Sequence, residues 1–499
     1  MNTGEFPSHR HPLNLKEISS EETEESRVCG LCGETVNGSR YECSQCNFAA
    51  HRGCAENPPS LVIEESKIHE HALTLLPSQV SFDCNACGIS GDKSPYVCLK
   101  CSFMTHKDCI DLPRVININR HGHRMFYTFF LGPGEWTCGV CRKRMDGRYG
   151  AYSCPRCEHY AVHSRCAARK DVWDGMELER NPEEEDDDED GEQLFSVIDE
   201  GSIHHFVHKQ HYLRLVQDEY TDDVCSGCAL PIATGDFYRC QECHFFLHVS
   251  CANLPRKITT FLHVHPLTLC PDDERSGGPN GLSRCDSCHL YFNGFSYRCL
   301  ECKDDNIEFD IRCSSVSVPF VFYGHMHPLF VNDLPTTENE KAKICSGCGL
   351  EGPIYILSCV ECSLHLCMTC ATLPVVAKYK YDGHLLSIHS GLEDPTGGYW
   401  CDICEEKIED KGNHYRCLGC GPVLHASCAV GSFRHMRPWL SFMSHGHEYK
   451  VVRNDWTSQL RCSNCDSDCH EPLLLMSTTS TGVTIYLCSS SCFTAYVPV

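Results

Sequence analysis

One phrase of cysteine and histidine residues recurs along the chain and constrains its fold more than any other feature. Residues 41–58 read YECSQCNFAAHRGCAENP, and nearly the same phrase returns as YVCLKCSFMTHKDCIDLP, YSCPRCEHYAVHSRCAAR and YRCQECHFFLHVSCANLP. Each copy contains a C-x2-C pair followed by His-x2-Cys. Two cysteines separated by two residues can turn both sulfurs toward one ion, so C-x2-C is a recurrent half of zinc sites. Repetition at this interval predicts a tandem array of small metal-stabilised modules.

The cysteine content allows either a disulfide scaffold or a metal protein, because the chain has 42 Cys and 30 His in 499 residues. The first residues, MNTGEFPSHRHPLNLKEISSEE, lack the apolar core of a secretory signal. No run of about twenty apolar residues occurs, so we expect no membrane span. We therefore expect a cytoplasmic or nuclear protein with reduced thiols, and Zn²⁺ as its cofactor.

The formal net charge of −24 argues against general binding of nucleic acid, which needs lysine and arginine to displace counterions from phosphates. An acidic balance also serves solubility alone. A basic patch confined to one module stays compatible with these numbers. Other proteins are the partners that we expect.

Eight modules follow from aligning a leading His pair, two C-x2-C pairs and a closing His-x2-Cys. In modules 1 to 4 the candidate metal ligands are His9, His11, Cys29, Cys32, Cys43, Cys46, His51 and Cys54; His69, His71, Cys84, Cys87, Cys98, Cys101, His106 and Cys109; His121, His123, Cys138, Cys141, Cys154, Cys157, His163 and Cys166; and His208, His211, Cys225, Cys228, Cys240, Cys243, His248 and Cys251. Eight ligands per module are enough for two tetrahedral sites.

The later modules vary in their ligands. Their candidates are His263, His265, Cys285, Cys288, Cys299, Cys302, Asp310 and Cys313; His325, His327, Cys345, Cys348, Cys359, Cys362, Cys367 and Cys370; His384, Cys401, Cys404, Cys417, Cys420, His425 and Cys428; and His445, His447, Cys462, Cys465, Cys488 and Cys492. Asp310 and Cys367 replace the closing His, and Asp382 stands where module 7 should have its first leading His. Zinc accepts all three side-chain types, so these replacements preserve a ligand.

Module 8 is degenerate, because it lacks the closing His-x2-Cys. Cys469 or His470 could complete a shell around Cys462 and Cys465. Cys270 has no place in the alignment, and we expect it to be a free buried thiol.

The alignment divides the chain into eight modules and one acidic connection. The predicted modules are 9–57, 69–113, 121–168, 208–255, 263–316, 325–374, 382–430 and 445–499, with a disordered linker over 171–203. Residues 179–193, ERNPEEEDDDEDGEQ, contain eight consecutive acidic residues that repel one another and bury nothing. An acidic docking segment for a basic partner is the alternative interpretation.

Aromatic residues recur at fixed places beside the cysteines. Seven tyrosines precede the second cysteine pair, or its counterpart in module 8, by two residues: Tyr41, Tyr96, Tyr152, Tyr238, Tyr297, Tyr415 and Tyr486. We expect them to form the small core of each module. Base stacking is the alternative, although neighbouring Arg and Lys residues are sparse.

The phrases HRHPL, HVHPL, HMHPL and LHVSCANLP, with the paired C-x2-C, resemble the C1-type zinc module and more closely its divergent plant form, the DC1 domain. The resemblance covers nearly the whole chain. It implies small zinc-stabilised α+β modules in tandem, each with short β-hairpins, a short C-terminal helix, two zinc ions and little extended core.

The resemblance also implies a crossed pairing of ligands. The leading His residues would join the second C-x2-C, and the first C-x2-C would join the closing His-x2-Cys. Typical C1 modules have one leading His and a late Cys, whose place here is held by Val62. The second leading His would replace that ligand. In the alternative, only His11 of the first pair binds and His9 is a solvated neighbour.

The function that we expect is a non-catalytic scaffold that binds proteins in intracellular signalling, and the resemblance implies a stress, hormone or defence setting. Only ten to twelve residues separate the cysteine pairs of modules 1 to 7, without the Gln-Gly of the diacylglycerol-binding groove, which argues against that lipid. A four-ligand structural zinc has no open position for water or substrate, so we expect no enzymatic activity.

Two other functions share parts of the pattern. A thiol-disulfide oxidoreductase can use C-x-x-C, but its motif opens a helix on a βαβ scaffold, which does not fit between these pairs. A PHD-like chromatin reader or ubiquitin ligase would use Cys29 through Cys87 in a four-Cys, one-His, three-Cys frame. That frame uses each first pair twice and leaves every leading His pair without a role.

Overall fold

The structure is a computed structural model in which a few segments of the chain are not described. The described residues are 3–4, 11–17, 27–33, 35–36, 38–76, 80–91, 94–181, 194–217, 221–232, 235–271, 282–302, 306–323, 325–331, 343–379, 381–382, 384–391, 399–408, 412–417, 419–444, 446–455, 459–479 and 482–496. His9, His445 and most of the acidic run therefore lie outside the described residues. The chain forms two compact units, Met1–Glu183 and Glu184–Val499.

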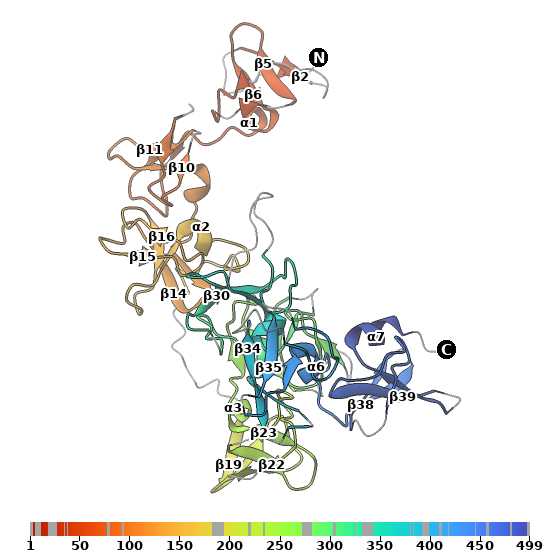
Figure 1. The fold of residues 1–499 in the computed structure, drawn as a ribbon. Coiled ribbons are helices and arrows are strands. Elements are labelled where there is room, and N and C mark those ends of the chain that lie inside the picture. Colours follow the sequence, from red (N-terminus) through yellow and green to blue (C-terminus); the bar gives the residue numbers. More distant parts are fainter. Residues whose placement is uncertain are drawn as a thin grey trace. The chain divides into compact units, whose positions relative to one another are not determined.

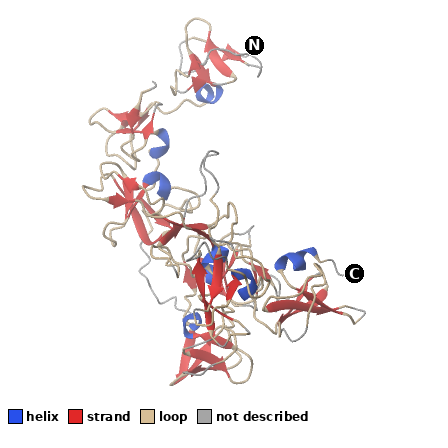
Figure 2. Ribbon diagram, viewed as in Figure 1, coloured by secondary structure: helices blue, strands red, loops and turns tan. Residues whose placement is uncertain are grey.

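Short strands dominate both units, and each helix has only one or two turns (Figure 2). This confirms the coarse prediction of tandem modules built from strands with few short helices. Module 3 shows the pattern: an antiparallel sheet in the order β13-β14-β17-β18, a separate hairpin β15-β16 that leads into and out of the first C-x2-C, and helix α2. Its elements are β13 (Val115–Ile118), β14 (His121–Thr128), β15 (Trp136–Thr137), β16 (Arg144–Met145), β17 (Ala151–Ser153), β18 (Ala161–His163) and α2 (Ser164–Ala167).

The other modules of the first unit repeat this arrangement (Figure 1). Module 1 consists of β1 (Thr3–Gly4), β2 (Leu13–Lys16), β3 (Arg27–Val28), β4 (Thr35–Val36), β5 (Arg40–Cys43), β6 (Ala49–His51) and α1 (Arg52–Glu56). Module 2 consists of β7 (Val62–Ile63), β8 (Leu73–Leu75), β9 (Phe82–Asp83), β10 (Ser90–Gly91), β11 (Tyr96–Cys98), β12 (Met104–Thr105) and the 3-10 helix η1 (Lys107–Cys109).

The second unit contains modules 4 to 8. Modules 4 and 5 consist of β19 (Phe195–Asp199), β20 (Ser202–His205), β21 (Leu213–Val216), β22 (Phe237–Cys240), β23 (Phe246–His248) and α3 (Val249–Ala252), then β24 (Lys257–Ile258), β25 (Leu267–Cys270), β26 (Ser283–Arg284), β27 (Tyr291–Phe292), β28 (Ser296–Cys299), β29 (Glu308–Asp310) and α4 (Ile311–Ser314). Modules 6 to 8 consist of β30 (Leu329–Val331), β31 (Ile356–Cys359), β32 (His365–Cys367) and α5 (Met368–Ala371); β33 (Val376–Lys378), β34 (Leu385–Ser390), β35 (Asn413–Arg416), β36 (Val423–His425) and α6 (Ala426–Val430); and β37 (Ser441–Ser444), β38 (His447–Arg453), β39 (Leu473–Thr478), β40 (Thr484–Leu487) and α7 (Ser490–Ala495).

The connections between modules belong to the sheets, which corrects several predicted boundaries. Strands β7, β13, β24 and β33 lie before the leading His pairs of modules 2, 3, 5 and 7, and each pairs with the first long strand of its module. The predicted linker over 171–203 is likewise too long, because β19 and β20 pair with each other and join the sheet of module 4. At the other end of that linker, Val172 is buried in the core of module 3.

Several of the recurrent tyrosines form hydrogen bonds with the segments that connect the modules. Of the seven recurrent tyrosines, Tyr238 and Tyr486 are only half-buried; the others are buried as the core prediction requires, among them Tyr96, Tyr152, Tyr297 and Tyr415. Their hydroxyl groups also donate hydrogen bonds to backbone carbonyls at the end of the preceding module: those of Ser60 at 2.9 Å and of Pro113, Pro255 and Pro374, each at 2.6 Å. These four tyrosines therefore hold modules 2, 3, 5 and 7 to the end of the preceding module.

Neighbouring modules also meet through the residues between the first two cysteines. The carbonyl of Asn85 accepts a hydrogen bond from Gly150 N at 2.8 Å, and the carbonyls of Gly227 and Gly347 accept from Phe295 N at 2.9 Å and Asn413 N at 3.1 Å. These contacts join module 2 to 3, 4 to 5 and 6 to 7. A Cβ atom at Gly294 would collide with the Gly227 carbonyl, so the approach of modules 4 and 5 requires glycine there.

The second unit has a larger core than small independent modules predict. One cluster of buried apolar residues runs from Ile203 to Ala429 and includes side chains of modules 4 to 7. Modules 1 and 3 have clusters of their own. The expectation of little extended core therefore fails for modules 4 to 7, because their contacts bury apolar surface that each module alone would leave exposed.

Candidate metal centres

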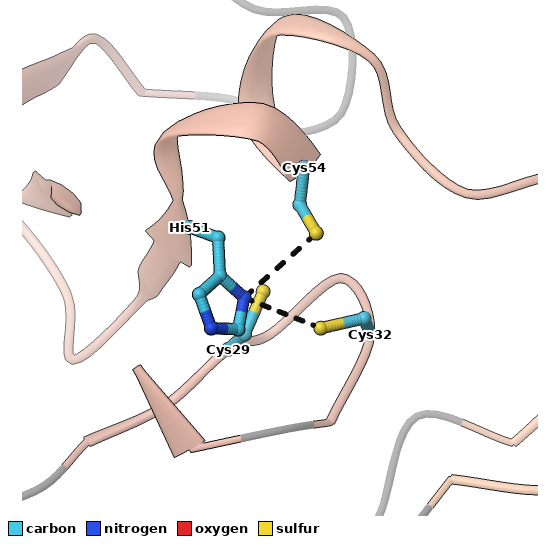
Figure 3. A group of neighbouring side chains, drawn as sticks. All are labelled: Cys29, Cys32, His51 and Cys54. Carbon is cyan, nitrogen blue, oxygen red and sulfur yellow. Dashed lines mark hydrogen bonds between the residues drawn. The ribbon is translucent and has the colours of Figure 1, made fainter. Parts of the chain in front are cut away.

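The first C-x2-C and the closing His-x2-Cys come together in module 1. Cys29 and Cys32 lie in the loop of the β3-β4 hairpin, His51 ends β6, and Cys54 lies one turn later in α1 (Figure 3). Nδ1 of His51 is 3.4 Å from Sγ of Cys32 and 3.8 Å from Sγ of Cys54. Three sulfurs and one nitrogen therefore surround a single point, which is the donor set of a structural zinc site.

The same arrangement returns in four further modules with nearly constant spacing. The distance from the closing His Nδ1 to the second cysteine sulfur is 3.5 Å for His106 and Cys87, 3.4 Å for His163 and Cys141, 3.4 Å for His248 and Cys228, and 3.3 Å for His425 and Cys404. The Nε2 atoms of His51, His248 and His425 face the carbonyls of Thr35, Pro231 and Lys407. Donation from Nε2–H to a carbonyl leaves the Nδ1 lone pair directed at the sulfurs, as in metal-bound histidines.

Close sulfur contacts make one thiol of a group more acidic and another less acidic: the pKa values of Cys166 and Cys428 are raised by hydrogen bonds with Cys138 and Cys401. Hydrogen bonds from Cys141 and Cys166 lower the pKa of Cys138 to about 3. A hydrogen bond from Cys428 lowers the pKa of Cys401 to about 4. Zinc needs every coordinating cysteine as a thiolate, so metal binding at these sites would release the protons that the remaining thiols hold.

The leading His residues meet the second C-x2-C, and module 5 shows the complete set. Nε2 of His263 and Nδ1 of His265 lie 3.3 and 3.4 Å from Sγ of Cys302, and Nδ1 of His265 lies 3.6 Å from Sγ of Cys299. The first His thus presents Nε2 and the second presents Nδ1. In module 1, Nδ1 of His11 is 3.6 Å from Sγ of Cys43.

Other modules present the same nitrogens. Nε2 of the first His reaches the last sulfur of the pair in His69 with Cys101 at 3.3 Å, His208 with Cys243 at 3.4 Å, and His325 with Cys362 at 3.5 Å. In module 3 the contact comes from the second His, with Nδ1 of His123 3.3 Å from Sγ of Cys157. The structure therefore brings leading His residues to the second cysteine pair in the described part of modules 1 to 7.

Buried histidine nitrogens without hydrogen bonds test whether a metal fits these sites. Nδ1 of His71, Nε2 of His121, Nδ1 of His211 and Nδ1 of His327 are buried and make no hydrogen bond to a described residue. These atoms follow the rule seen in module 5, where the first His of the pair presents Nε2 to the cysteines and the second His presents Nδ1. In His211 and His327 the other nitrogen faces a carboxylate, Glu242 at 3.4 Å and Glu361 at 3.2 Å. A zinc ion would give these buried atoms the partner that they lack.

The replaced ligands keep their places. In module 6, Cys367 lies 3.7 Å from Cys348, sulfur to sulfur. In module 7, Nδ1 of His384 lies 3.1 Å from Sγ of Cys420 and 3.1 Å from Oδ1 of Asp382. In module 5, Oδ2 of Asp310 lies 3.4 Å from Sγ of Cys288.

Module 8 contains a set that the sequence analysis did not assemble. Sγ of Cys488 lies 3.7 Å from Sγ of Cys465 and 3.7 Å from Sγ of Cys492. Cys462 is buried beside them, and its hydrogen bond raises the pKa of Cys488 after the larger effects of burial and of the Glu471 charge. The C-x3-C pair thus replaces His-x2-Cys, and Cys469 and His470 are not needed to complete the shell. A search for fixed spacing does not group Cys462 and Cys465 with Cys488 and Cys492, because more than ten residues separate Cys469 from Cys488.

Two further observations concern the cysteines as a whole. The structure assigns none of the 42 to a disulfide. Five groups of four Cys and His side chains lie in modules 1 to 3, and ten more groups of at least three metal-binding side chains occur among the described residues. Cys270, which has no place in the repeat, is buried in β25 with its Sγ 3.6 Å from the Thr268 carbonyl oxygen.

The comparisons with known proteins agree with this geometry. The family model of the C1 domain matches residues 7–55, 67–110, 119–167, 206–252 and 379–429. These ranges are modules 1 to 4 and 7, whereas modules 5, 6 and 8 depart from the His-x2-Cys pattern. No curated protein and no solved structure matches the chain significantly. Among the described helices, none has the length and apolar character needed to cross a membrane.

Proposed function

Because this chain is a tandem protein of divergent C1 domains, we propose that it is a non-catalytic zinc-binding scaffold for other proteins in intracellular signalling or stress responses. The observation that carries the proposal is the convergence of Cys and His donors in each module, with orphaned histidine nitrogens directed at the second cysteine pair. Zinc supplies folding energy to modules that are too small to fold on an apolar core alone.

The donor sets support a structural role for the metal. Each set of four protein ligands closes a tetrahedral shell and leaves no position for water or substrate. Several of the cysteines, such as Cys29, Cys138, Cys225 and Cys285, have no exposed surface. Burial is not the decisive feature, since Cys46, Cys101 and Cys243 are exposed. A site closed by four protein ligands neither activates a nucleophile nor polarises a carbonyl, so we expect no zinc catalysis.

We predict fifteen zinc ions per chain, two in each of modules 1 to 7 and one in module 8. The measurement is native mass spectrometry of the freshly reduced full chain. The double variant Cys488→Ser, Cys492→Ser should hold fourteen, because it removes half of the module 8 shell. Cys270→Ser is the matched control and should keep fifteen. Eight or fewer ions in the unchanged chain would show that half of these sites do not bind.

Exposed aromatic side chains support proteins as partners. Phe129 and Phe130 in module 3 are 49% and 58% exposed, beside Phe126 at 38%. Aromatic residues are enriched in the centres of protein interfaces. The net charge of −24 disfavours nucleic acid and anionic lipid surfaces, which attract basic proteins.

Affinity capture with the zinc-loaded full chain tests this role. We expect defined proteins to be retained, and the variant Phe129→Ser, Phe130→Ser to lose at least tenfold of that material. The matched control is Val197→Ser, Ile198→Ser, which changes an exposed apolar pair on β19 in the other unit. Equal retention by both variants would contradict a role for the phenylalanines, and enrichment of lipid or nucleic acid would contradict the scaffold.

A further inference from the structure

A histidine outside the repeat lies beside the first metal centre of module 5. His435 follows α6 in the turn that connects modules 7 and 8, and only 2% of its surface is exposed. Both of its ring nitrogens are buried and make no hydrogen bond to a described residue. Nδ1 lies 3.4 Å from Oδ2 of Asp310. The Asp310 carboxylate is thus near Nδ1 but forms no hydrogen bond with it, and a buried imidazole that forms no hydrogen bond is costly, so its position calls for a further partner.

Module 5 is the module whose closing His is replaced by a carboxylate. Its site contains Cys285, Cys288 and Cys313, all buried, with Asp310 in the place of the histidine. Three thiolates and a carboxylate give one more negative charge than the three-Cys, one-His sites of modules 1 to 4 and 7. Because Asp310 is itself buried, its charge stays beside the three thiolates whichever group binds, and a neutral imidazole as the fourth ligand adds no further charge.

Asp310 already has another structural task. Its Oδ1 accepts hydrogen bonds from Arg312 N at 2.9 Å and Cys313 N at 3.0 Å, which caps the N-terminus of α4. The closing residues His51, His163, His248, Cys367 and His425 make no such side-chain cap. The aspartate therefore serves the helix, as aspartate does at many N-caps.

The segment that carries His435 is fixed to module 5 by its own hydrogen bonds. The side chain of Asn293 accepts from Arg437 N at 2.6 Å and donates to Arg437 O at 3.3 Å. The guanidinium of Arg437 donates back to Asn293 O at 2.8 Å. Arg312 Nη1 donates to Arg434 O at 3.2 Å. The imidazole is thus held at the site by contacts on both sides of it in sequence.

We propose that His435 is the fourth protein ligand of the first zinc ion of module 5, together with Cys285, Cys288 and Cys313. Asp310 is then the residue that caps α4 and positions the imidazole, and the site becomes a zinc clasp between module 5 and the chain after module 7. This inference rests on the zinc binding proposed above. It adds a ligand that lies 122 residues after Cys313.

Zinc counting by native mass spectrometry on full-chain variants tests the clasp. We expect His435→Gln to hold one ion fewer than the unchanged chain and His435→Cys to restore the full number, because a thiolate can replace the imidazole as a ligand. Asp310→Asn should keep the full number, since an amide oxygen still caps the helix. His425→Gln, at the closing position of module 7, should lose one ion.

A buried histidine that belongs to none of the proposed ligand sets supplies the control. His205 is 1% exposed, and its Nε2 faces the Ala252 carbonyl at 3.1 Å. His205→Gln should keep the full number of ions. A full count in His435→Gln, or no restoration by His435→Cys, would overturn the clasp even if every other site binds zinc. Loss of an ion by Asp310→Asn alone would make Asp310 the ligand. A chain without zinc at any site would instead contradict the proposed function.

Discussion

Removal of zinc from the full chain by a strong chelator should unfold all eight modules. Each module has about one turn of helix and strands of two to eight residues, so its sheet cannot persist without a fixed loop geometry. Structural zinc contributes on the order of 10–16 kcal/mol of folding free energy per site, which is as large as the total stability of an ordinary domain. The measurement is far-ultraviolet circular dichroism together with limited proteolysis, before chelation, after chelation and after zinc is returned.

Magnesium added in place of zinc is the control for that experiment, because Mg²⁺ prefers oxygen ligands and should not restore the fold. Retention of protease resistance by the metal-free chain would contradict a folding role for zinc. The larger core of modules 4 to 7 makes this outcome most informative for the second unit.

Loss of one ligand should have local effects in module 1 and extended effects in module 4. Cys54→Ser removes a ligand beside a core that contains only module 1 residues. Cys251→Ser removes a ligand whose side chain belongs to the cluster shared by modules 4 to 7. Three remaining ligands hold structural zinc poorly, so each variant should lose most of the folding energy of its site.

Hydrogen exchange followed by mass spectrometry measures how far the loss of structure extends along the chain in each of the two variants. We expect Cys54→Ser to lose protection only over module 1, and Cys251→Ser to lose it through module 4 and over the contact of Gly227 with Phe295 in module 5. Exchange confined to module 4 would show that the shared core does not couple the modules. Val249→Ala in α3 is a control for general weakening of the same helix.

Much of this architecture follows from the spacing of cysteine and histidine residues. Fixed intervals predicted the C1 resemblance, which the family match confirms, and they named the residues that the structure groups. All four cysteines of the module 8 set were predicted ligands, but their grouping into one shell was not predicted, because Cys488 and Cys492 are spaced by three residues and lie far from Cys465 in sequence. His435 was missed because it does not belong to the repeated pattern. Module 5 lacks its closing histidine and His435 has no place in any module, and pairing these two facts could have suggested it as a ligand.

The contacts between modules could not be predicted from the residue spacing within a single module. The hydroxyl of Tyr297 serves the Pro255 carbonyl, but the sequence shows only an aromatic residue at a core position. The collision that excludes a side chain at Gly294 depends on the backbone of another module. Such contacts depend on three-dimensional placement, and local spacing carries no signal for them.

Because strands connect the modules, cleavage of the chain between the closing helix of one module and the leading histidine of the next would disrupt a sheet. A protease that cleaved the chain between β13 and β14 would detach an edge strand from module 3, whose partners Phe126 and Met125 would keep unpaired backbone groups. An open edge of this kind is a template for another chain. Fragments of this protein should therefore associate through the open strand edge, whereas the intact chain should not. The strand lost from one molecule could be replaced by the equivalent strand of a second molecule.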